Sequence, residues 1–191
     1  MKKILIITAH PSTKGFTHRI ANAFKDGATS KGNEVEILDL YKTEHQIPFL
    51  AFEEKKDMMN LSPAVVAIQA KMNWADSVVW VHPLWWMGAP AIMKNMIDSV
   101  FMPHFAYKYT GPGQRVKLLK GKDAYVFITC DGSNLTYSLL GMPFRVIWQL
   151  CTLWFCGFKN KSFKVFDKSL FKTEEHRLKF LAKIKKIGER V

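Results

Sequence analysis

The segment SVVWVHPLWWMGAPAIMKNMIDSVF (77–101) joins an apolar run to an amphipathic stretch through a turn that carries two adjacent tryptophans. Residues 77–83 are short, apolar and rich in valine, which predicts a strand covered on both faces. The apolar residues of 91–101 recur at helical spacing, which predicts a helix. A doubly covered strand followed by a helix is the repeating unit of a parallel sheet with helices on both sides.

The same alternation extends along the chain in both directions from this segment. Serine at the N-cap and proline at the first helical position predict a helix that starts at Ser62-Pro63, and Gly32 suits the end of an earlier helix. We predict one domain over residues 1–191, an α/β fold built on a doubly wound five-stranded parallel sheet of order 2-1-3-4-5 with helices on both faces. The predicted strands are 2–8, 34–40, 77–83, 124–130 and 161–167, and the helices are 17–31, 62–73, 91–101, about 137–153 and from 173 onward, with a less regular stretch at 41–60.

Charge is the unusual bulk property of the chain. There are 28 Lys and Arg against 16 Asp and Glu, a net charge of +12, which favours anionic partners. Part of the excess lies in 159–168 and 176–190, where a solvated lysine-rich face is the simplest interpretation and a peripheral membrane contact stays open. The aromatic residues gather in apolar runs and do not alternate with lysines, so we predict no nucleic-acid partner.

The N-terminus and the cysteines favour the cytoplasm. MKKILIITAH has too short an apolar core for a signal peptide and lacks a small-residue cleavage site. Cys130, Cys151 and Cys156 are odd in number, share no metal-ligand spacing, and fit buried thiols in a reducing compartment. We therefore predict a cytoplasmic protein without a metal site.

The segment 138–158 is apolar enough to be mistaken for a membrane span. Arg145 and Gln149 fall in its middle, where burial in hydrocarbon would cost several kcal/mol, so we predict no transmembrane segment. A helix with excess apolar surface is often half of an interface, and we predict a homodimer contact here, with a fully buried core helix as the alternative.

Three loops at the carboxyl ends of predicted strands are candidates for ligand binding. The loop 10–18 offers hydroxyls and a helix N-terminus to a phosphate, although an ordinary capped turn explains it equally well. The loop 82–88 offers an apolar wall to a flat conjugated ring, and at least one of its tryptophans should face the cleft. The loop 129–137 offers polar groups to the edge of such a ring, and the hydroxyl of Tyr137 would stabilise developing negative charge.

The sequence at these loops resembles the flavodoxin-like quinone reductases, which are the NAD(P)H:quinone oxidoreductases and their shorter bacterial relatives. The longest match is PLWWMGAPAIMKNMIDSVFMPHFAYKY (83–109), and it is supported by AHPSTKGFT (9–17), ITCDGSNLTYSLLG (128–141) and CGF (156–158). The resemblance spans nearly the whole chain up to its last helix.

The resemblance implies a bound flavin, FAD or FMN, and a homodimer with sites at the subunit boundary. It also implies a ping-pong exchange in which NADPH or NADH reduces the flavin and a small quinone, nitro or azo compound reoxidises it. By position, His10, Phe16 and Thr17 would hold the phosphate end; Pro83, Leu84, Trp85, Trp86 and Met87 the ring; Thr129, Gly132 and Tyr137 its polar edge; and Phe105 and Tyr107 the substrate side.

One departure from the family pattern affects Tyr137. Larger relatives carry a histidine six residues after this tyrosine, and the two together are proposed to stabilise charge on the reduced flavin. Pro143 stands at that position here. Some short relatives are flavin-binding regulatory subunits of membrane potassium-efflux systems, so a regulatory role for this chain stays the alternative to an enzyme.

Overall fold

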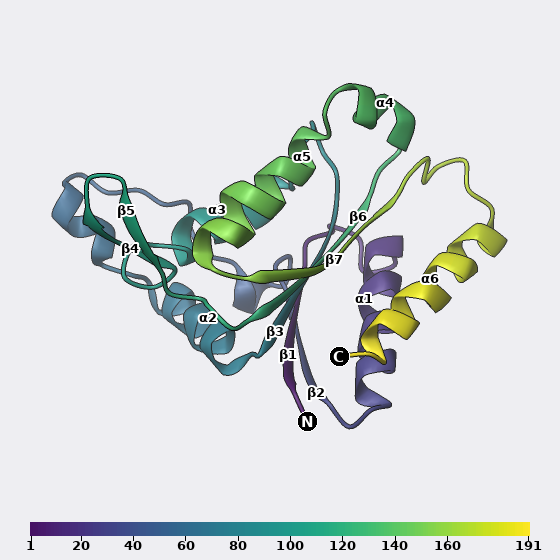
Figure 1. Cartoon of the computed structure of the whole chain (residues 1–191), viewed down its shortest axis with the longest axis horizontal. Coiled ribbons are helices and arrows are strands. Elements are labelled where there is room, and N and C mark those ends of the chain that lie inside the picture. The colour runs from purple at the N-terminus through teal and green to yellow at the C-terminus, as the bar shows by residue number, and fades with distance from the viewer.

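The centre of the protein is a parallel sheet of five strands (Figure 1). A computed structural model describes the backbone of residues 1–191 and all side chains except those of residues 43, 55 and 56. The strand order is β2-β1-β3-β6-β7. This is the predicted order 2-1-3-4-5, because β6 and β7 are the fourth and fifth strands of this sheet and β4 and β5 belong to a separate hairpin. The strands are β1 (Lys3–Thr8), β2 (Glu34–Asp39), β3 (Ser77–Pro83), β6 (Asp123–Thr129) and β7 (Lys159–Phe166).

Helices cover both faces of the sheet, as predicted. α1 (Phe16–Thr29) and α6 (Glu174–Gly188) pack side by side on one face, while α2, α3, α5 and η3 cover the other (Figure 1). The remaining bounds are α2 (Pro63–Trp74), α3 (Ala91–Val100), α4 (Asn134–Leu139), α5 (Pro143–Val146), the π-helix η3 (Ile147–Trp154) and the 3₁₀ turns η1 (Thr43–His45) and η2 (Lys55–Met59).

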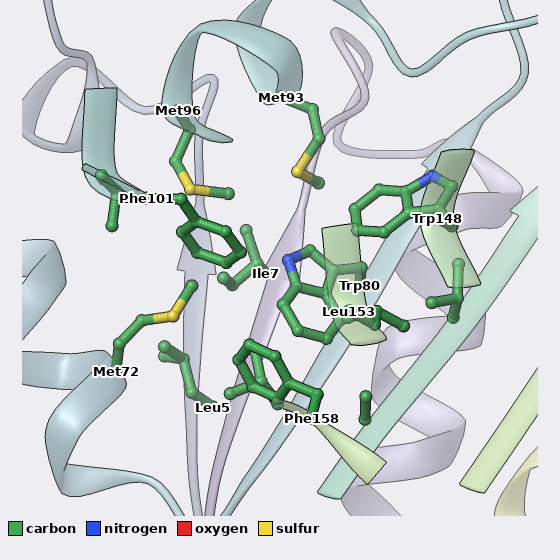
Figure 2. Packing of buried hydrophobic residues seen from close by; sticks show 14 of the residues in the cluster. Leu5, Ile7, Met72, Trp80, Met93, Met96, Phe101, Trp148, Leu153 and Phe158 are labelled. Carbon is green, nitrogen blue, oxygen red and sulfur yellow. The ribbon is translucent and has the colours of Figure 1, made fainter. Parts of the chain in front are cut away.

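Trp80 is the centre of the larger core. Successive side chains of a strand point to opposite faces, so Trp80 points toward α3 and η3 while its neighbours in β3 point toward α1. Its ring centroid lies 5.5 Å from that of Trp148 and 5.3 Å from that of Phe158. Figure 2 shows these rings together with the methionines of α2 and α3. This packing fixes η3 over the end of β3, where the candidate site begins.

The predicted helix over about 137–153 is wrong as one continuous element. The chain leaves the helical conformation at Gly141 (φ 74°) and Met142 (φ 46°), and a new helix starts at Pro143. Proline cannot donate an intrahelical hydrogen bond and disfavours helical geometry at the residue before it, so it suits the first position of a helix and not its interior. Residues 147–154 then form a π-helix, which periodicity alone does not distinguish from an α-helix.

The structure also contains a hairpin that was not predicted, and it corrects the expectation about the cysteines. The antiparallel hairpin of β4 (Tyr107–Gly111) and β5 (Gln114–Lys117) was not predicted, because both strands are short, polar and largely exposed. The turn Gly111-Pro112-Gly113 was the available signal. Cys130 and Cys156 are buried, but Cys151 is exposed on η3 and contradicts the expectation of three buried thiols. Within the described residues, no helix is both long and apolar enough to cross a membrane.

Candidate functional site

The candidate site lies along the carboxyl edge of the sheet, where strand pairing brings the predicted loops together. Thr8 pairs with Val81, and Thr129 pairs with both Pro83 and Phe166. The amide of Leu84 donates to the carbonyl of Thr129 at 2.7 Å, which ties the second loop to the third. Neighbouring strands lie about 4.8 Å apart, so the ends of β1, β3 and β6 fall within about 10 Å of one another.

The first loop presents an uncapped helix N-terminus at this edge. α1 begins at Phe16, its N-cap residue Gly15 contributes no side-chain hydrogen bond, and its first turn contains no acidic residue. The amide of Ser12 donates to Nδ1 of His10 at 3.0 Å, which folds the loop back on itself. The first N–H groups of a helix lack intrahelical partners and carry partial positive charge, so this end of α1 suits an anion.

Thr17 adds a buried polar group at the same edge of the sheet. Its side chain is 1% exposed, and its hydroxyl has no hydrogen-bond partner among the residues the structure describes. A buried hydroxyl without a partner costs free energy, so a ligand atom that satisfies it would recover that cost. The ring of Phe16, by contrast, packs against Phe166 at 4.7 Å, which leaves its backbone as the part that faces the loop.

Arg177 is a candidate residue that sequence analysis missed. It lies in the first turns of α6, donates to the carbonyl of Ser169 at 2.7 Å, and places its guanidinium 5.0 Å from the centre of the Phe16 ring. A guanidinium beside an open helix N-terminus adds positive charge for a phosphate. The signal in the sequence was its position after the last predicted strand. The carboxyl end of that strand was not among the three loops considered as ligand-binding candidates.

The second loop is a tight turn with strained tryptophan geometry. Trp85 and Gly88 exchange backbone hydrogen bonds of 3.0 and 2.9 Å across the turn, and Trp86 (φ 49°) and Met87 (φ 60°) occupy its centre. Side-chain-bearing residues rarely adopt positive φ, and such outliers concentrate at functional sites. The turn leaves Trp86 wholly exposed and Trp85 42% exposed, so both side chains present aromatic surface to solvent at the sheet edge.

His82 is a buried residue that holds the start of this turn in place. The side chain is fully buried, Nδ1 lies 2.8 Å from the carbonyl of Pro83, and the ring stacks on Trp148 at 5.3 Å. Burial lowers the pKa of His82 from 6.5 to about 4, so its imidazole is neutral at physiological pH. Neutral Nδ1–H donates to Pro83, which holds the end of β3 at the start of the turn.

Tyr137 lies across the third loop and points its hydroxyl at Gly132. A Cβ atom at residue 132 would fall 2.2 Å from the Tyr137 oxygen, so only glycine leaves room for this arrangement. Burial raises the pKa of Tyr137, as does its proximity to Cys130, and the phenol therefore stays protonated at neutral pH. Its ring packs edge-on against Phe144 at 5.4 Å, one residue beyond Pro143 where larger relatives carry histidine.

Asn134 is a second buried polar group at this loop. Its amide N–H donates to Asp167 at 3.1 Å, while its side-chain oxygen is buried without a partner among the described residues. The hydroxyl of Ser133 caps α4 through the amides of Leu135 and Thr136. These contacts hold the loop in shape, and the Asn134 side-chain oxygen is an acceptor that a ligand could use.

Two hollows lie beside α3 and η3, and the first of them adjoins the tryptophan turn. The first, of about 170 Å³, lies between Met87, α3 and η3, and the second, of about 440 Å³, extends from there toward the hairpin. Ile97 and Thr152 line both of them, so the two hollows are neighbours along η3. Tyr107 lines the second hollow, whereas Phe105 packs against the core beside it.

Comparison with known proteins identifies the family. The sequence profile of a family described as having a flavodoxin-like fold matches residues 2–189. The chain belongs to this family. An uncharacterised NAD(P)H oxidoreductase of Haemophilus influenzae is 37% identical to this flavodoxin-like protein over 170 residues, which cover 85% of this chain and 82% of the relative.

Two further similarities agree with this membership. NAD(P)H dehydrogenase [quinone] 1 of Cavia porcellus is 32% identical over 191 residues, covering 83% of the flavodoxin-like protein and 66% of the relative. The crystal structure of Smu.1420 from Streptococcus mutans superposes with a TM-score of 0.88 at 28% identity, covering 99% of this chain and 100% of that one. With relatives of this kind, the flavodoxin-like protein is an oxidoreductase.

Proposed function

We propose that the protein is a flavin-dependent NAD(P)H:quinone oxidoreductase. The proposal rests on one observation. A helix N-terminus that suits an anion and two exposed tryptophans lie at the same edge of the sheet. Thr17 supplies a buried hydroxyl without a partner among the described residues beside the open end of α1, and Trp85 and Trp86 present exposed aromatic surface on the loop after β3. A flavin has this combination of a phosphate and a flat conjugated ring, so the residues present fit it.

The phosphate end of the flavin would lie at the first loop. The free N–H groups at the start of α1, from Phe16 onward, and the hydroxyl of Thr17 would donate to phosphate oxygens. His10 would hold the loop in shape through Ser12. Arg177 would add charge from the first turns of α6.

The ring would be backed by the turn after β3. Pro83, Leu84 and Met87 supply rigid apolar contacts, and at least one of the two tryptophans would cover the ring against water. The flavin supplies two-electron hydride chemistry that no protein side chain offers. The work of the protein is to bind, to orient and to exclude water.

Tyr137 would act at the polar edge of the ring together with Thr129 and Gly132. Because its pKa is raised, its hydroxyl remains a hydrogen-bond donor over the working range of pH and would stabilise negative charge that develops nearby. Pro143 occupies the place of the family histidine, and the nearest ring to Tyr137 is that of Phe144, so this donor acts without an imidazole partner.

The acceptor would enter through the hollows along η3, with Tyr107 on their outer side and Phe105 behind it. One entrance serves a nicotinamide and then a quinone, nitro or azo compound in turn, which is the arrangement that a ping-pong exchange requires. FAD and FMN both fit the donors described, as do NADH and NADPH. The unpaired cysteines suit a reducing compartment, and a cytoplasmic location stays a prediction.

We also propose that two chains form the working unit. The outward face of α5 and η3 exposes Val146, Ile147, Leu150 and Trp154 by 45 to 57% each. A contiguous apolar face of this kind is typical of homodimer interfaces. A second chain placed there would also cover the open side of the hollows.

An absorption spectrum of the purified protein, with acid release and chromatography of any yellow cofactor, tests the proposal first. We expect stoichiometric FAD or FMN, followed by oxidation of NADH or NADPH that depends on a soluble quinone and gives parallel double-reciprocal plots. A protein that takes up neither flavin contradicts the proposal. A protein that holds flavin but turns over no substrate contradicts the enzyme and supports the regulatory subunit.

A further inference from the structure

A groove of about 490 Å³ lies between β7 and α6, away from the site described above. It opens on the face of the sheet that α1 and α6 cover. Tyr125 forms part of its floor and precedes Thr129 by four strand residues, which places the groove about 13 Å from the carboxyl edge. Its lining residues are Tyr125, Lys161, Ser162, Lys164, Lys183, Lys186, Ile187 and Arg190.

Five of these eight lining residues are cationic, and they stand on two opposite walls. Lys183 and Lys186 are three residues apart and therefore share one face of α6, and Arg190 lines the same hollow from two residues beyond the end of that helix. Lys161 and Lys164 face them from β7. Like charges that line one hollow repel one another unless an anion lies between them.

The described side chains supply little counter-charge to the groove. Lys161 contacts Asp123 at 3.6 Å, and Asp123 also binds Lys2 at 3.1 Å. The other four cations form no ion pair within the part of the chain whose side chains are described. Elsewhere on α6 the pattern differs, because Lys179 pairs with Glu175 at 2.6 Å.

The floor of the groove combines apolar surface with hydroxyl donors. Tyr125 is 6% exposed and packs against Phe24 at 5.3 Å, so its ring is fixed. Burial raises the pKa of Tyr125 to about 12, which keeps its hydroxyl protonated and able to donate. Ser162 adds a second hydroxyl, and Ile187 completes the apolar part of the floor.

Protection of a sheet edge explains only half of this charge. β7 is an edge strand, and lysines on edge strands prevent pairing with other chains. That explanation covers Lys161 and Lys164. It does not cover Lys183 and Lys186 of α6 or Arg190 just after that helix, which have no strand edge to protect and nevertheless line the same hollow.

We propose that this groove is a second binding site, which takes a small ligand carrying at least two linked phosphate groups. Its volume lies within the range of about 300–1,000 Å³ found for small-ligand sites, and its concave form suits a compact ligand better than a flat bilayer. Lys183, Lys186, Arg190 and Lys164 bind the phosphate oxygens from both sides. Tyr125 and Ile187 support whatever apolar or aromatic group the phosphates carry.

Inorganic tripolyphosphate is the probe that tests the proposal, with binding to the full chain measured by isothermal titration calorimetry. In about 150 mM NaCl the Debye length is about 8 Å, so distant surface charges contribute little. We expect Lys183→Gln/Lys186→Gln to weaken binding at least about tenfold, the effect of losing one or more charge-assisted hydrogen bonds. The matched control Lys179→Gln/Lys185→Gln removes the same charge from α6 outside the groove and should change binding less than about twofold.

Four results would overturn the proposal. The first is no detectable binding of tripolyphosphate to the parent protein. The second is an equal loss in both double variants, which would mean that the overall charge of +12 attracts the probe without a site. The third is binding that neither pair of substitutions changes, which would place the probe elsewhere, such as at the start of α1. Duplex DNA or anionic phosphatidylserine vesicles that bind through Lys183 and Lys186 while tripolyphosphate fails to compete would likewise exclude a small-ligand site.

Discussion

At the scale of single residues, two local arrangements decide the candidate chemistry. Gly132 leaves the space that the hydroxyl of Tyr137 fills, since any Cβ there would fall 2.2 Å from the phenolic oxygen. Trp86 and Met87 accept positive φ so that the turn after β3 can project aromatic surface outward. Strain of about 1–3 kcal/mol for each such residue is tolerated where the surrounding structure fixes it, here through the paired hydrogen bonds of Trp85 and Gly88.

Substitutions at Trp85 and Tyr137 should separate cofactor retention from chemistry. We expect Trp85→Ala to weaken flavin binding about tenfold or more, because one aromatic stacking contact contributes about 1–3 kcal/mol. Tyr137→Phe should keep the flavin and slow its reduction by NAD(P)H about tenfold to a hundredfold, because a hydrogen-bond donor to developing charge is lost. Flavin content after gel filtration measures the first effect and stopped-flow absorbance the second.

These two assignments fail together if both variants match the parent in flavin content and in the rate of flavin reduction. A Tyr137→Phe protein that loses its flavin would instead make Tyr137 a binding residue.

Buried His82 should make the stability of the protein depend on pH. Its pKa is about 4 in the folded protein against 6.5 when solvated, so the unfolded chain binds one more proton between these two values. The free energy of unfolding should therefore fall as the pH drops from 6.5 to 4, by about 3 kcal/mol at 1.36 kcal/mol per pKa unit. Urea unfolding at a series of pH values measures this slope.

The variant His82→Asn isolates that contribution. Asparagine keeps an N–H donor for the carbonyl of Pro83, but it is smaller than the imidazole ring, so the variant should be less stable at pH 7. Because asparagine does not titrate, the pH dependence of the unfolding free energy should be smaller by the uptake of about one proton. If parent and variant show the same slope between pH 6.5 and 4, His82 is not the responsible group.

At the scale of elements, helix contacts position the loops. The π-helix η3 holds Trp148 against both Trp80 and His82, and the hydroxyl of Thr152 donates to the carbonyl of Ile147, five residues earlier, at 3.0 Å. On the other face, α6 lies so close to α1 that two glycines meet backbone atoms. A Cβ at Gly27 would fall 2.1 Å from the carbonyl oxygen of Lys185, and one at Gly188 would fall 2.4 Å from that of Phe24.

The substitution Gly27→Ala should therefore destabilise the protein. Alanine favours a helix over glycine by about 1 kcal/mol, but the close approach of α6 would force the helices apart at a cost of about 1–3 kcal/mol or more. Because the clash is with backbone, we expect the steric cost to win and the urea midpoint to fall. The control is Asn22→Ala on the exposed face of α1, which should stabilise slightly, and a rise of the midpoint in both variants would contradict the contact.

At the scale of the whole molecule, one large apolar face is exposed to solvent. It extends over α4, α5 and η3 and includes Leu139, 82% exposed, as well as Leu150 and Trp154. The opposite face of the molecule carries the basic groove and its lysines. This separation of an apolar face from a basic face suits a dimer that pairs through η3 and leaves the basic groove of each chain exposed.

A charge on η3 should dissociate that dimer. We expect Leu150→Lys to raise the dimer dissociation constant at least about tenfold, since it would place an unpaired ammonium in an apolar contact. Leu178→Lys is the matched control, because Leu178 is 55% exposed on α6 and Leu150 is 56% exposed on η3. Sedimentation velocity over a concentration series measures both. A parent protein that is monomeric throughout the series, or equal dissociation of the two variants, would exclude this face as the interface.

The sequence by itself determined the class of fold and predicted the place of the candidate site. Doubly apolar runs such as 77–83 must be covered on both faces, and parallel strands with helical crossovers leave few arrangements, so strand order followed from periodicity. The carboxyl ends of those strands then located the loops that contain Thr17, Trp85 and Tyr137. These inferences rest on local patterns that one stretch of chain carries by itself.

Tertiary structure alone decided which side chains are available there. Phe16 turned its ring into the helix layer because Phe166 and Arg177 come close only in the folded chain. The break before Pro143, the π-helix, the hairpin 107–117 and the groove between β7 and α6 likewise depend on contacts between segments far apart in sequence. Periodicity records which residues are apolar, but packing decides which of them find a partner, and the unpartnered ones define the sites proposed here.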